Sequence, residues 1–398
     1  MDLNITTLKK LESFAKGASD LLEERKDLNP KRVRTFERPE AVEYLKTDYR
    51  TIEKYCADLN IDPRQKANDL YEPTPWQLTI NDLYKIREAL PETTILKKKL
   101  LASMPRMKAK GCQIIVVQNQ KGGVAKTLTT ITLATGTATE YHQQYRVAII
   151  DMDGQSTLST YQPNLTSSKR TTIGDLLPLD PKSNEYIKTV KNAISDTTIP
   201  NLKIIPADQS DRDVEATFHE GVHEGTITNP YKRLKSIIDA IKSDFDVIYI
   251  DTPPSLNFAS INAYFAATSV LFPFGASQND TDATCQYLTY LPSIYRLLIK
   301  EGHNGYDFMK MLITNYEESY SSQEVMSELK EYFPLELLPT KFNKSEAIKV
   351  CAKERNSIYD ISKSCYPGTK STFNKAKLNT NALLSEVMDE ITKVWKNI

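Results

Sequence analysis

The feature that most constrains the fold is an apolar run leading directly into a glycine loop and then a helical segment, in IIVVQNQKGGVAKTLTTITLA at residues 114–134. Gly122 and Gly123 let backbone N–H groups approach phosphate oxygens closely, and the start of a helix adds positive dipole there. Lys126 supplies a cation, and Thr127 supplies a hydroxyl that can bind magnesium. Packing alone does not explain this order of residues, so we expect a phosphate-binding loop.

From residue 113 onward, short apolar runs alternate with longer segments that have helical spacing. The apolar runs cover residues 113–117, 146–150, 202–205, 246–250, 269–272 and 311–314. This alternation predicts an α/β domain whose mostly parallel sheet is covered by helices on both faces. Such sheets bind ligands at the carboxyl ends of their strands, which is where the glycine loop begins.

Three aspartates follow two of these apolar runs. Asp151 and Asp153 come directly after RVAII, and Asp251 comes directly after DVIYI. A single aspartate at a strand end is most often a helix cap. Downstream of a glycine loop, however, one carboxylate can hold the magnesium shell and another can orient an attacking water. The order of the three elements therefore favours a magnesium-nucleotide site.

The first 110 residues have helical patterning. A heptad-like apolar stripe, with spacings of 3, 4, 3 and 4, consists of Leu8, Leu11, Ala15, Ala18 and Leu22. One interpretation is a helix packed on its own domain. The other is a contact between two copies of the chain, since so short a stripe is marginal alone.

Residues 39–59 have the pattern of two short helices joined by a tight turn. Pro39 can open the first helix, residues 46–48 form the turn, and the second helix runs over Tyr49–Leu59. A helix-turn-helix has this arrangement, although any helical hairpin resembles it. The residues expected to face DNA near the start of the second helix are Tyr49, Arg50, Thr51 and Lys54. Residues 91–112 follow another predicted helix, Thr79–Leu90, and resemble a basic linker.

The charge balance limits the kinds of partner. The chain of 398 residues has 51 basic and 51 acidic side chains, which excludes a uniformly basic nucleic-acid coat. Residues 341–377 nevertheless hold nine lysines and arginines against three acidic residues, a local net charge of +6. Such a stretch is usually a solvated face, but it also suits sequence-independent DNA binding. In that case Lys349, Lys353 and Arg355 would contact phosphates.

Other features favour a reducing cytosol and no membrane contact. The five cysteines are scattered without a CxxC pair, and the first residues lack a basic-then-apolar signal. The predicted last helix, Ala382–Trp395, is amphipathic, but its polar side mixes acidic and basic residues. Anionic lipid gains little from such a face, so core packing is the expected role of this helix.

The segments KGGVAKT, IDMDGQS and IYIDTPP, in this order, resemble the deviant Walker A ATPases of the ParA/MinD group. The first segment matches the form KGGVGKT at six of seven positions. It departs from the ordinary P-loop at both outer glycines, which are Gln120 and Ala125 here. The resemblance implies a P-loop fold over residues 111–398, with ATP or ADP and Mg²⁺ as ligands.

The resemblance also implies roles for individual residues. Lys121 would reach the nucleotide of a partner subunit in an ATP-sandwich dimer, and Lys126 would bind the β- and γ-phosphates. Asp153 would position the hydrolytic water. The implied magnesium ligands are Thr127, Asp151 and Asp251. The implied nucleotide-binding residues are Gly122, Gly123, Val124, Ala125, Lys126, Thr127, Leu128 and Asn315, the last as an adenine contact.

Two departures from the family pattern bear on catalysis. Ala125 replaces a glycine and adds a methyl group to a crowded loop, and Gly154 replaces a frequent proline. Either could slow turnover without abolishing nucleotide binding. They leave open a rival interpretation, in which the chain is a transcription factor that uses ATP only as a ligand.

The helix-turn-helix and basic linker are similar to those of the large plasmid-type ParA proteins. The resemblance implies a possible dimerisation helix at 1–34, a winged-helix or helix-turn-helix domain with linker at 35–110, and a ParA-type ATPase domain at 111–398. It implies a homodimer, with higher-order assembly on DNA left open. The implied partners are a ParB-like centromere-binding protein, operator DNA and nonspecific nucleoid DNA. The implied function is ATP-dependent DNA partition with autorepression and slow, partner-stimulated hydrolysis.

Overall fold

The structure is a computed structural model that describes residues 3–28, 31, 33–64, 75–91, 111–140, 144–161 and 170–397. The chain divides into two compact units, Met1–Arg32 and Val33–Ile398. The first unit holds one helix, α1 (Leu3–Leu28), which forms where the sequence predicts it. Leu8, Leu11 and Phe14 of this helix are exposed. Nothing within the described part of this unit therefore covers Leu8 and Leu11 of the apolar stripe.

The second unit begins with a small helical module. Its elements are β1 (Thr35–Phe36), α2 (Arg38–Leu45), α3 (Tyr49–Asp58), β2 (Leu78–Thr79) and α4 (Ile80–Ala89), with β1 and β2 paired antiparallel. The turn between α2 and α3 is tight because Lys46 adopts left-handed backbone and Asp48 accepts the Thr51 N–H at 3.0 Å. Ile52 and Cys56 of α3 are buried in the module's core. The two helices form at the predicted positions.

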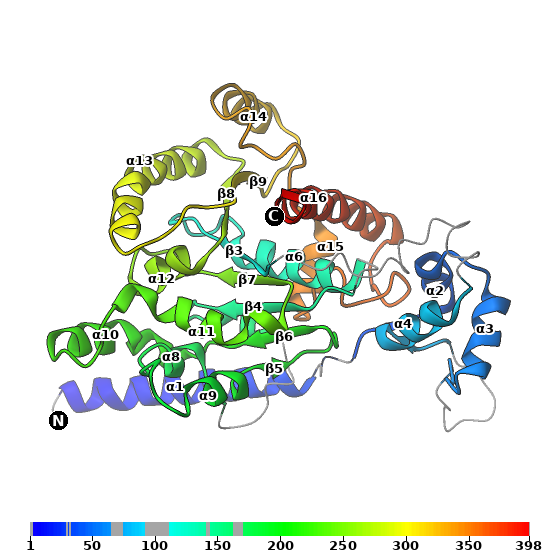
Figure 1. Ribbon diagram of the computed structural model, residues 1–398, viewed down its shortest axis with the longest axis horizontal. Helices are drawn as coiled ribbons and strands as arrows, with labels where there is room; N and C mark the ends of the chain where they lie inside the picture. Colours follow the sequence, from blue (N-terminus) through cyan, green and yellow to red (C-terminus); the bar gives the residue numbers. More distant parts are fainter. Residues whose placement is uncertain are drawn as a thin grey trace. The chain divides into compact units, whose positions relative to one another are not determined.

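The larger part of the unit is a seven-stranded sheet with helices on both faces (Figure 1). Its strands are β3 (Gln113–Val117), β4 (Val147–Asp151), β5 (Ser195–Asp196), β6 (Leu202–Ile205), β7 (Val247–Asp251), β8 (Ser269–Gly275) and β9 (Phe308–Thr314). They lie in the order β5-β6-β4-β7-β3-β8-β9, and every pair except β5–β6 is parallel. All five residues of β3, β4 and β7 are buried, as expected of strands covered on both faces. The predicted α/β fold is confirmed.

The helices that follow β3 connect and cover the strands. They are α6 (Lys126–Glu140), α7 (Thr157–Thr160), α8 (Ile173–Leu176), α9 (Tyr186–Asn192), α10 (Val214–His223), α11 (Arg233–Ile241), α12 (Phe258–Ala266), α13 (Gln278–Lys300), α14 (Tyr320–Tyr332), α15 (Glu346–Lys353) and α16 (Lys370–Asn397). Short 3-10 turns occur at Gln209–Asp213, Pro230–Lys232 and Lys242–Asp244. One apolar core lies on each face of the sheet.

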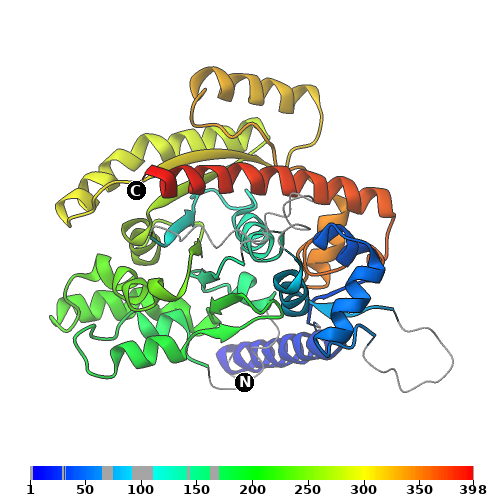
Figure 2. The same cartoon turned by 45° about the vertical axis from the view of Figure 1, so that its right-hand side comes forward.

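The helical module packs against the segment between α15 and α16 (Figure 2). The buried Arg34 donates to the Tyr359 carbonyl at 3.0 Å and forms an ion pair with Glu40 at 2.7 Å. Nearby, Ser362 donates to the Glu37 carboxylate at 3.3 Å. The module and the sheet are therefore joined by buried polar contacts as well as by the chain itself.

Some element bounds differ from the sequence prediction. The last helix begins at Lys370 rather than Ala382, because Phe373 and Ala376 continue its buried stripe towards the N-terminus. β9 begins at Phe308 rather than 311, and β8 extends to Gly275 rather than 272. β4 and β7 each run one residue later than predicted. The predicted basic linker falls largely on residues 92–110, which lie outside the described residues. Among the helices that the structure describes, none has the length and apolar character of a membrane span.

Candidate nucleotide-binding site

The carboxyl ends of three neighbouring strands bring the glycine loop and two aspartates together. β7 lies between β3 and β4, so Asp251 is in register with Val117 on one side and Asp151 on the other. Val117 ends β3, and the glycine loop starts three residues later. Both aspartates are fully buried. The parallel register thus places two carboxyl groups under the loop.

The glycine loop leaves room for a bulky ligand. A Cβ added to Gly122 or Gly123 would meet nothing within 4 Å, and Gly123 has a φ of +80°. Lys126, the first residue of α6, is buried, and its ammonium donates to the Lys121 carbonyl at 3.2 Å. Burial lowers the pKa of Lys126, while the charges of Asp251 and Asp153 oppose that shift. A buried cation next to open loop backbone suits a phosphate group.

Two polar contacts fix the loop from the side of β9. Thr314 donates to the Val124 carbonyl at 3.0 Å, and the Asn315 side chain donates to the Gly123 carbonyl at 2.9 Å. Asn315 was expected to contact adenine. In this structure its amide holds the glycine loop, and its exposed position leaves the carbonyl side of the amide open.

The two buried aspartates have unusual electrostatics. Burial and the nearby charge of Asp151 raise the pKa of Asp251 to about 8, although Thr127 and Lys126 lower it. Burial also raises the pKa of Asp151, to about 6, against hydrogen bonds from the Ser159 hydroxyl and N–H. Both shifts favour the protonated form of the buried carboxyl groups, and a bound cation would favour their ionised form.

The donor set fits a magnesium ion held together with phosphates. One oxygen of Asp251, Oδ2, is buried without a hydrogen-bond partner within the described residues, while Thr130 donates to the other at 3.3 Å. The Thr127 hydroxyl lies close enough to influence the pKa of Asp251. A hydroxyl and a carboxylate oxygen are ligands that Mg²⁺ prefers, and it usually completes its shell with phosphate oxygens and water.

Asp153 lies apart from the buried pair, at the rim. It is half-buried, its own N–H donates to Asp151 at 3.2 Å, and its carboxylate accepts the Gln155 N–H at 2.9 Å. One carboxylate oxygen is engaged by that turn. The position suits contact with a water molecule above the loop rather than with the metal.

The two departures from the family pattern have local structural correlates. Ala125 has a φ of +59°, in the left-handed region that favours glycine. A Cβ on Gly154 would lie 2.9 Å from the Arg212 side chain and 3.1 Å from its backbone nitrogen. The loop after β4 is thus packed closely against the turn at Gln209–Asp213, and a proline ring at 154 would require that turn to move.

Two residues beside the glycine loop, Asn119 and Asp280, were not singled out from the sequence. Asp280, in the first turn of α13, lies 3.4 Å from the Lys121 ammonium. Asn119 donates to the Pro273 carbonyl and to Thr284, and accepts the Lys121 N–H at 2.9 Å. The polar QN pair after an apolar strand was a usable signal for Asn119. In the sequence, Asp280 is an acidic residue of the kind common in the first turn of a helix. It comes close to the loop because α13 follows β8, and β8 pairs with β3.

The residues expected to bind DNA lie on two surfaces. Arg50 and Lys54 are exposed on α3, while Tyr49 is 38% exposed and stacks with the guanidinium of Arg38. Thr51 is committed to the cap, because its hydroxyl donates to Asp48 at 2.8 Å. The hydroxyl of Thr51 is therefore less available for a base contact than its position on the helix suggested.

The second surface is the basic stretch at 341–377. Lys349 and Lys353 are exposed on α15, and Arg355 follows the helix with a φ of +57°. Lys349 forms an ion pair with Glu346 at 3.7 Å. Over the ranges that the structure describes, neither Lys353 nor Arg355 forms an ion pair. Both cations are therefore available for phosphates, as are the exposed Lys363 and Lys375 of the same stretch.

Comparison with known proteins places the chain in a family. The family model described as an AAA domain matches residues 112–301. The sporulation initiation inhibitor protein Soj of Bacillus subtilis is 30% identical over 227 residues, which cover 56% of this chain and 80% of Soj. This chain belongs to the ParA family of partition ATPases.

The likeness to ParA-type relatives extends beyond the sheet domain. The putative replication protein A of Rhizobium rhizogenes is 26% identical, over 80% of this chain and 78% of its own length. A solved structure titled "Partition Protein" has a TM-score of 0.64 at 22% identity, and covers 97% of this chain and 98% of that one. The fold of that structure is therefore shared over nearly the whole chain, including the helical module before the sheet.

Proposed function

We propose that this ParA-type chain binds MgATP in the glycine loop and hydrolyses it slowly. Lys126 would offset the charge of the β- and γ-phosphates from its buried position, while backbone N–H groups at Gly122 and Gly123 would donate hydrogen bonds to the phosphate oxygens. Thr127 and Asp251 would hold the magnesium ion, with Asp151 supporting them. The ion would neutralise charge that develops on the phosphates during hydrolysis.

In this proposal the remaining catalytic contributions come from the rim of the site. Asp153 would orient the attacking water, because its carboxylate lies above the buried pair and outside the metal shell. Lys121 would reach the nucleotide of a second subunit, so that ATP joins two chains. The exposed stripe of α1 would add a second contact between the same two chains.

The proposed cellular role is partition of DNA, in the cytoplasm and on the nucleoid. The ATP-bound dimer would hold nonspecific DNA through Lys353 and Arg355, and a ParB-like protein would release it by stimulating hydrolysis. The ADP or apo form would bind an operator through α3 and repress the partition operon. A sequence-independent surface and a base-reading helix serve these two tasks separately.

The single observation that carries the proposal is the buried Lys126 side chain beside two buried aspartates, Asp151 and Asp251, under an open glycine loop. Its test is ATP turnover measured alone, with nonspecific DNA, with a ParB-like protein, and with both. Turnover should be slow alone and fastest with both additions. Turnover that neither addition changes would contradict a partition role.

One observation favours a second candidate, a transcription factor that uses ATP only as a ligand. Ala125 adopts the left-handed backbone conformation that glycine prefers. Strain there could slow ATP hydrolysis more than it weakens ATP binding. Operator binding that responds equally to ATP and to a nonhydrolysable analogue, with no stimulated turnover, would favour this candidate.

A further inference from the structure

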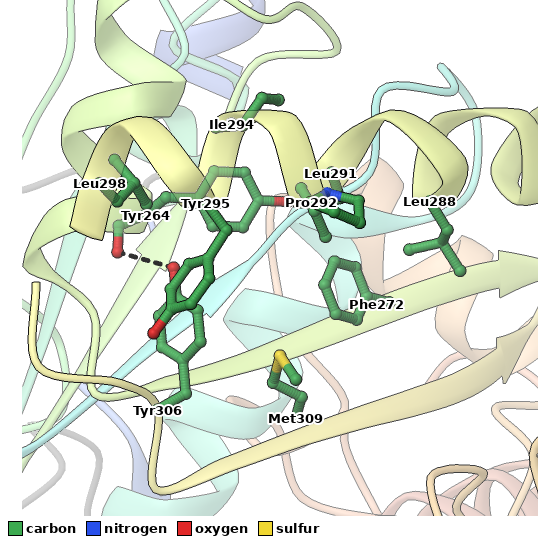
Figure 3. A pocket seen from close by; sticks show the side chains of 10 residues that line it. All are labelled: Tyr264, Phe272, Leu288, Leu291, Pro292, Ile294, Tyr295, Leu298, Tyr306 and Met309. Atoms are coloured by element: carbon green, nitrogen blue, oxygen red, sulfur yellow. Dashed lines mark hydrogen bonds between the residues drawn. The ribbon is translucent and has the colours of Figure 1, made fainter. Parts of the chain in front are cut away.

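The described part of the chain has an apolar pocket, the α13 pocket, between α13 and strands β8 and β9 (Figure 3). It measures about 330 Å³, and no charged side chain is among its lining residues. Tyr306 donates to the Tyr264 carbonyl at 3.1 Å, and the Tyr264 hydroxyl is hydrogen-bonded to that of Tyr287. Two of the nearby hydroxyls are therefore satisfied within the protein. The remaining walls do not select one occupant over another, so the pocket assigns no ligand.

The loop after β4, in contrast, lies beside a charged side chain with a specific contact. Arg212 belongs to the 3-10 turn at Gln209–Asp213, which follows β6. Its side chain is exposed and forms no ion pair with any residue that the structure describes. Its guanidinium donates instead to the side-chain oxygen of Gln155 at 2.7 Å. This contact joins the segment after β6 to the loop that carries Asp153.

The segment after β4 is held against the segment after β6 at two points. β4 and β6 are parallel neighbours, so both segments leave the sheet at the same edge. At the first point, the Ala207 N–H donates to the Ser159 hydroxyl at 2.9 Å. The second point is the contact between Arg212 and Gln155. Asp153 precedes both anchored residues of its segment, so these contacts bear on where it lies.

Gln155 connects Arg212 to Asp153. Its backbone N–H donates to the Asp153 carboxylate at 2.9 Å, while its side-chain oxygen accepts from Arg212. Within the described residues, the Asp153 carboxylate accepts no other hydrogen bond. Its orientation therefore depends on where the Gln155 backbone lies, and Arg212 restrains that backbone.

Gly154 shows why such a restraint matters. Glycine has the greatest backbone freedom of any residue, and this glycine lies directly between Asp153 and Gln155. A Cβ at Gly154 would lie 2.9 Å from Cγ of Arg212 and 3.1 Å from its backbone nitrogen. A larger residue at 154 would therefore displace the arginine. The glycine makes room for Arg212, and Arg212 limits the freedom that the glycine brings.

The backbone of Arg212 is itself anchored. The preceding residue, Asp211, accepts the Thr172 hydroxyl at 2.7 Å and the Asp208 N–H at 3.0 Å. Thr172 is the N-cap of α8, so the turn is fastened to another element. The arginine therefore extends from a fixed point, as is required of a residue that positions another.

We propose that Arg212 is a positioning residue for ATP hydrolysis, which acts through Gln155 to hold Asp153 where it orients the attacking water. This inference rests on the proposed function, which assigns the water to Asp153. Small misplacements of such a group lower the rate steeply. Neither Arg212 nor Gln155 belongs to the glycine loop or to the proposed magnesium ligands, so ATP binding should not depend on their contact.

The test measures ATP affinity and turnover in the full chain carrying Arg212→Ala, Gln155→Ala or both. Each single variant should lower kcat by about tenfold and change KM and ATP affinity less than about twofold. The double variant should be about as slow as either single variant, because both changes remove the same link. Arg212→Lys keeps a donor and should recover part of the lost rate. Lys182 is an exposed cation in the segment before α9, and the control Lys182→Ala should match the wild type.

A second readout does not depend on turnover. Amide hydrogen exchange in the nucleotide-free chain reports how often the Gln155 N–H leaves the Asp153 carboxylate. Arg212→Ala and Gln155→Ala should each speed exchange across residues 152–156 by about threefold or more, since one restraining hydrogen bond is lost. Lys182→Ala should leave this exchange unchanged.

The inference is overturned, while the proposed function stands, if Arg212→Ala turns over ATP at the wild-type rate. It is also overturned if Arg212→Ala is slow but Gln155→Ala is not, or if neither variant speeds exchange. The guanidinium would then act on the nucleotide rather than through the loop. A wild type without ATP turnover, alone or with DNA and the ParB-like protein, would overturn both proposals.

Discussion

The ammonium of Lys121 lies 3.4 Å from the carboxylate of Asp280, at the start of α13, within a single chain. The ParA resemblance assigns Lys121 to the nucleotide of a second subunit. In one chain, therefore, this lysine already has a partner that it would have to leave. The ion pair is partly exposed, with 38% and 28% of the two side chains accessible, so its strength is modest.

We predict that Asp280→Asn favours ATP-dependent dimerisation. An exposed ion pair contributes at most about 1 kcal/mol, and each of the two chains gives one up on dimerisation. The dimer dissociation constant should therefore fall by up to about thirtyfold. Sedimentation with ATP and with ADP measures the change. Asp244→Asn, which breaks the surface pair with Lys191 at 2.9 Å, is the control and should leave dimerisation unchanged. A weaker dimer in Asp280→Asn would show that Asp280 supports the dimeric state instead.

A second prediction concerns pH. The raised pKa values of Asp151 and Asp251 mean that the folded, nucleotide-free chain holds more protons than the unfolded chain between about pH 4 and pH 8. Their contribution to the free energy of unfolding is therefore fully present at low pH and is lost as pH rises through this window. Asp251→Asn should flatten that dependence, as measured by urea denaturation across the pH range.

The control for the pH experiment is Asp389→Asn, at an exposed position on α16, which should keep the wild-type slope. The same physics predicts that MgATP binding releases a proton near neutral pH, since the metal displaces it from the pair. An identical slope in Asp251→Asn and wild type would mean that the pair is fully ionised without ligand.

The third prediction is that Ala125→Gly stabilises the protein. Left-handed backbone costs an alanine roughly 1–2 kcal/mol, and the greater freedom of glycine in the unfolded chain offsets about half of that. The free energy of unfolding should rise by about 0.5–1 kcal/mol. Ala382→Gly, at an exposed position in α16, should lower it by up to about 1 kcal/mol. Destabilisation by Ala125→Gly would show that the methyl group packs favourably.

A fourth prediction separates the two DNA surfaces. Replacing Lys353 and Arg355 with alanine should lower nonspecific DNA affinity in the presence of ATP and reduce the salt slope by roughly two phosphate contacts per chain. Replacing Arg50 and Lys54 should weaken operator binding while leaving nonspecific binding largely intact. Binding isotherms over a salt series measure both. Should the Lys353 and Arg355 variant keep the wild-type slope, the nonspecific surface lies elsewhere.

The sequence predicted the central strands, the glycine loop and the gathering of the aspartates because each depends on local pattern. Val117, Asp151 and Asp251 end apolar runs, and parallel pairing brings such ends to one edge. The Lys121–Asp280 contact was not predictable in this way, since it joins residues 159 positions apart across two strands. The α13 pocket likewise depends on how Pro292 and Tyr306 pack against the sheet. The early start of α16 was missed because Lys370–Lys377 is rich in polar residues.

The measurement that tests the central claim most directly is ATP affinity in Lys126→Ala beside wild type, with Asp153→Ala as the companion. The account predicts that Lys126→Ala loses ATP binding, because loop dipoles alone do not offset the phosphate charge. Asp153→Ala should bind ATP with nearly wild-type affinity and hydrolyse it slowly. Equal ATP affinity in Lys126→Ala and wild type would contradict the site on which the account rests.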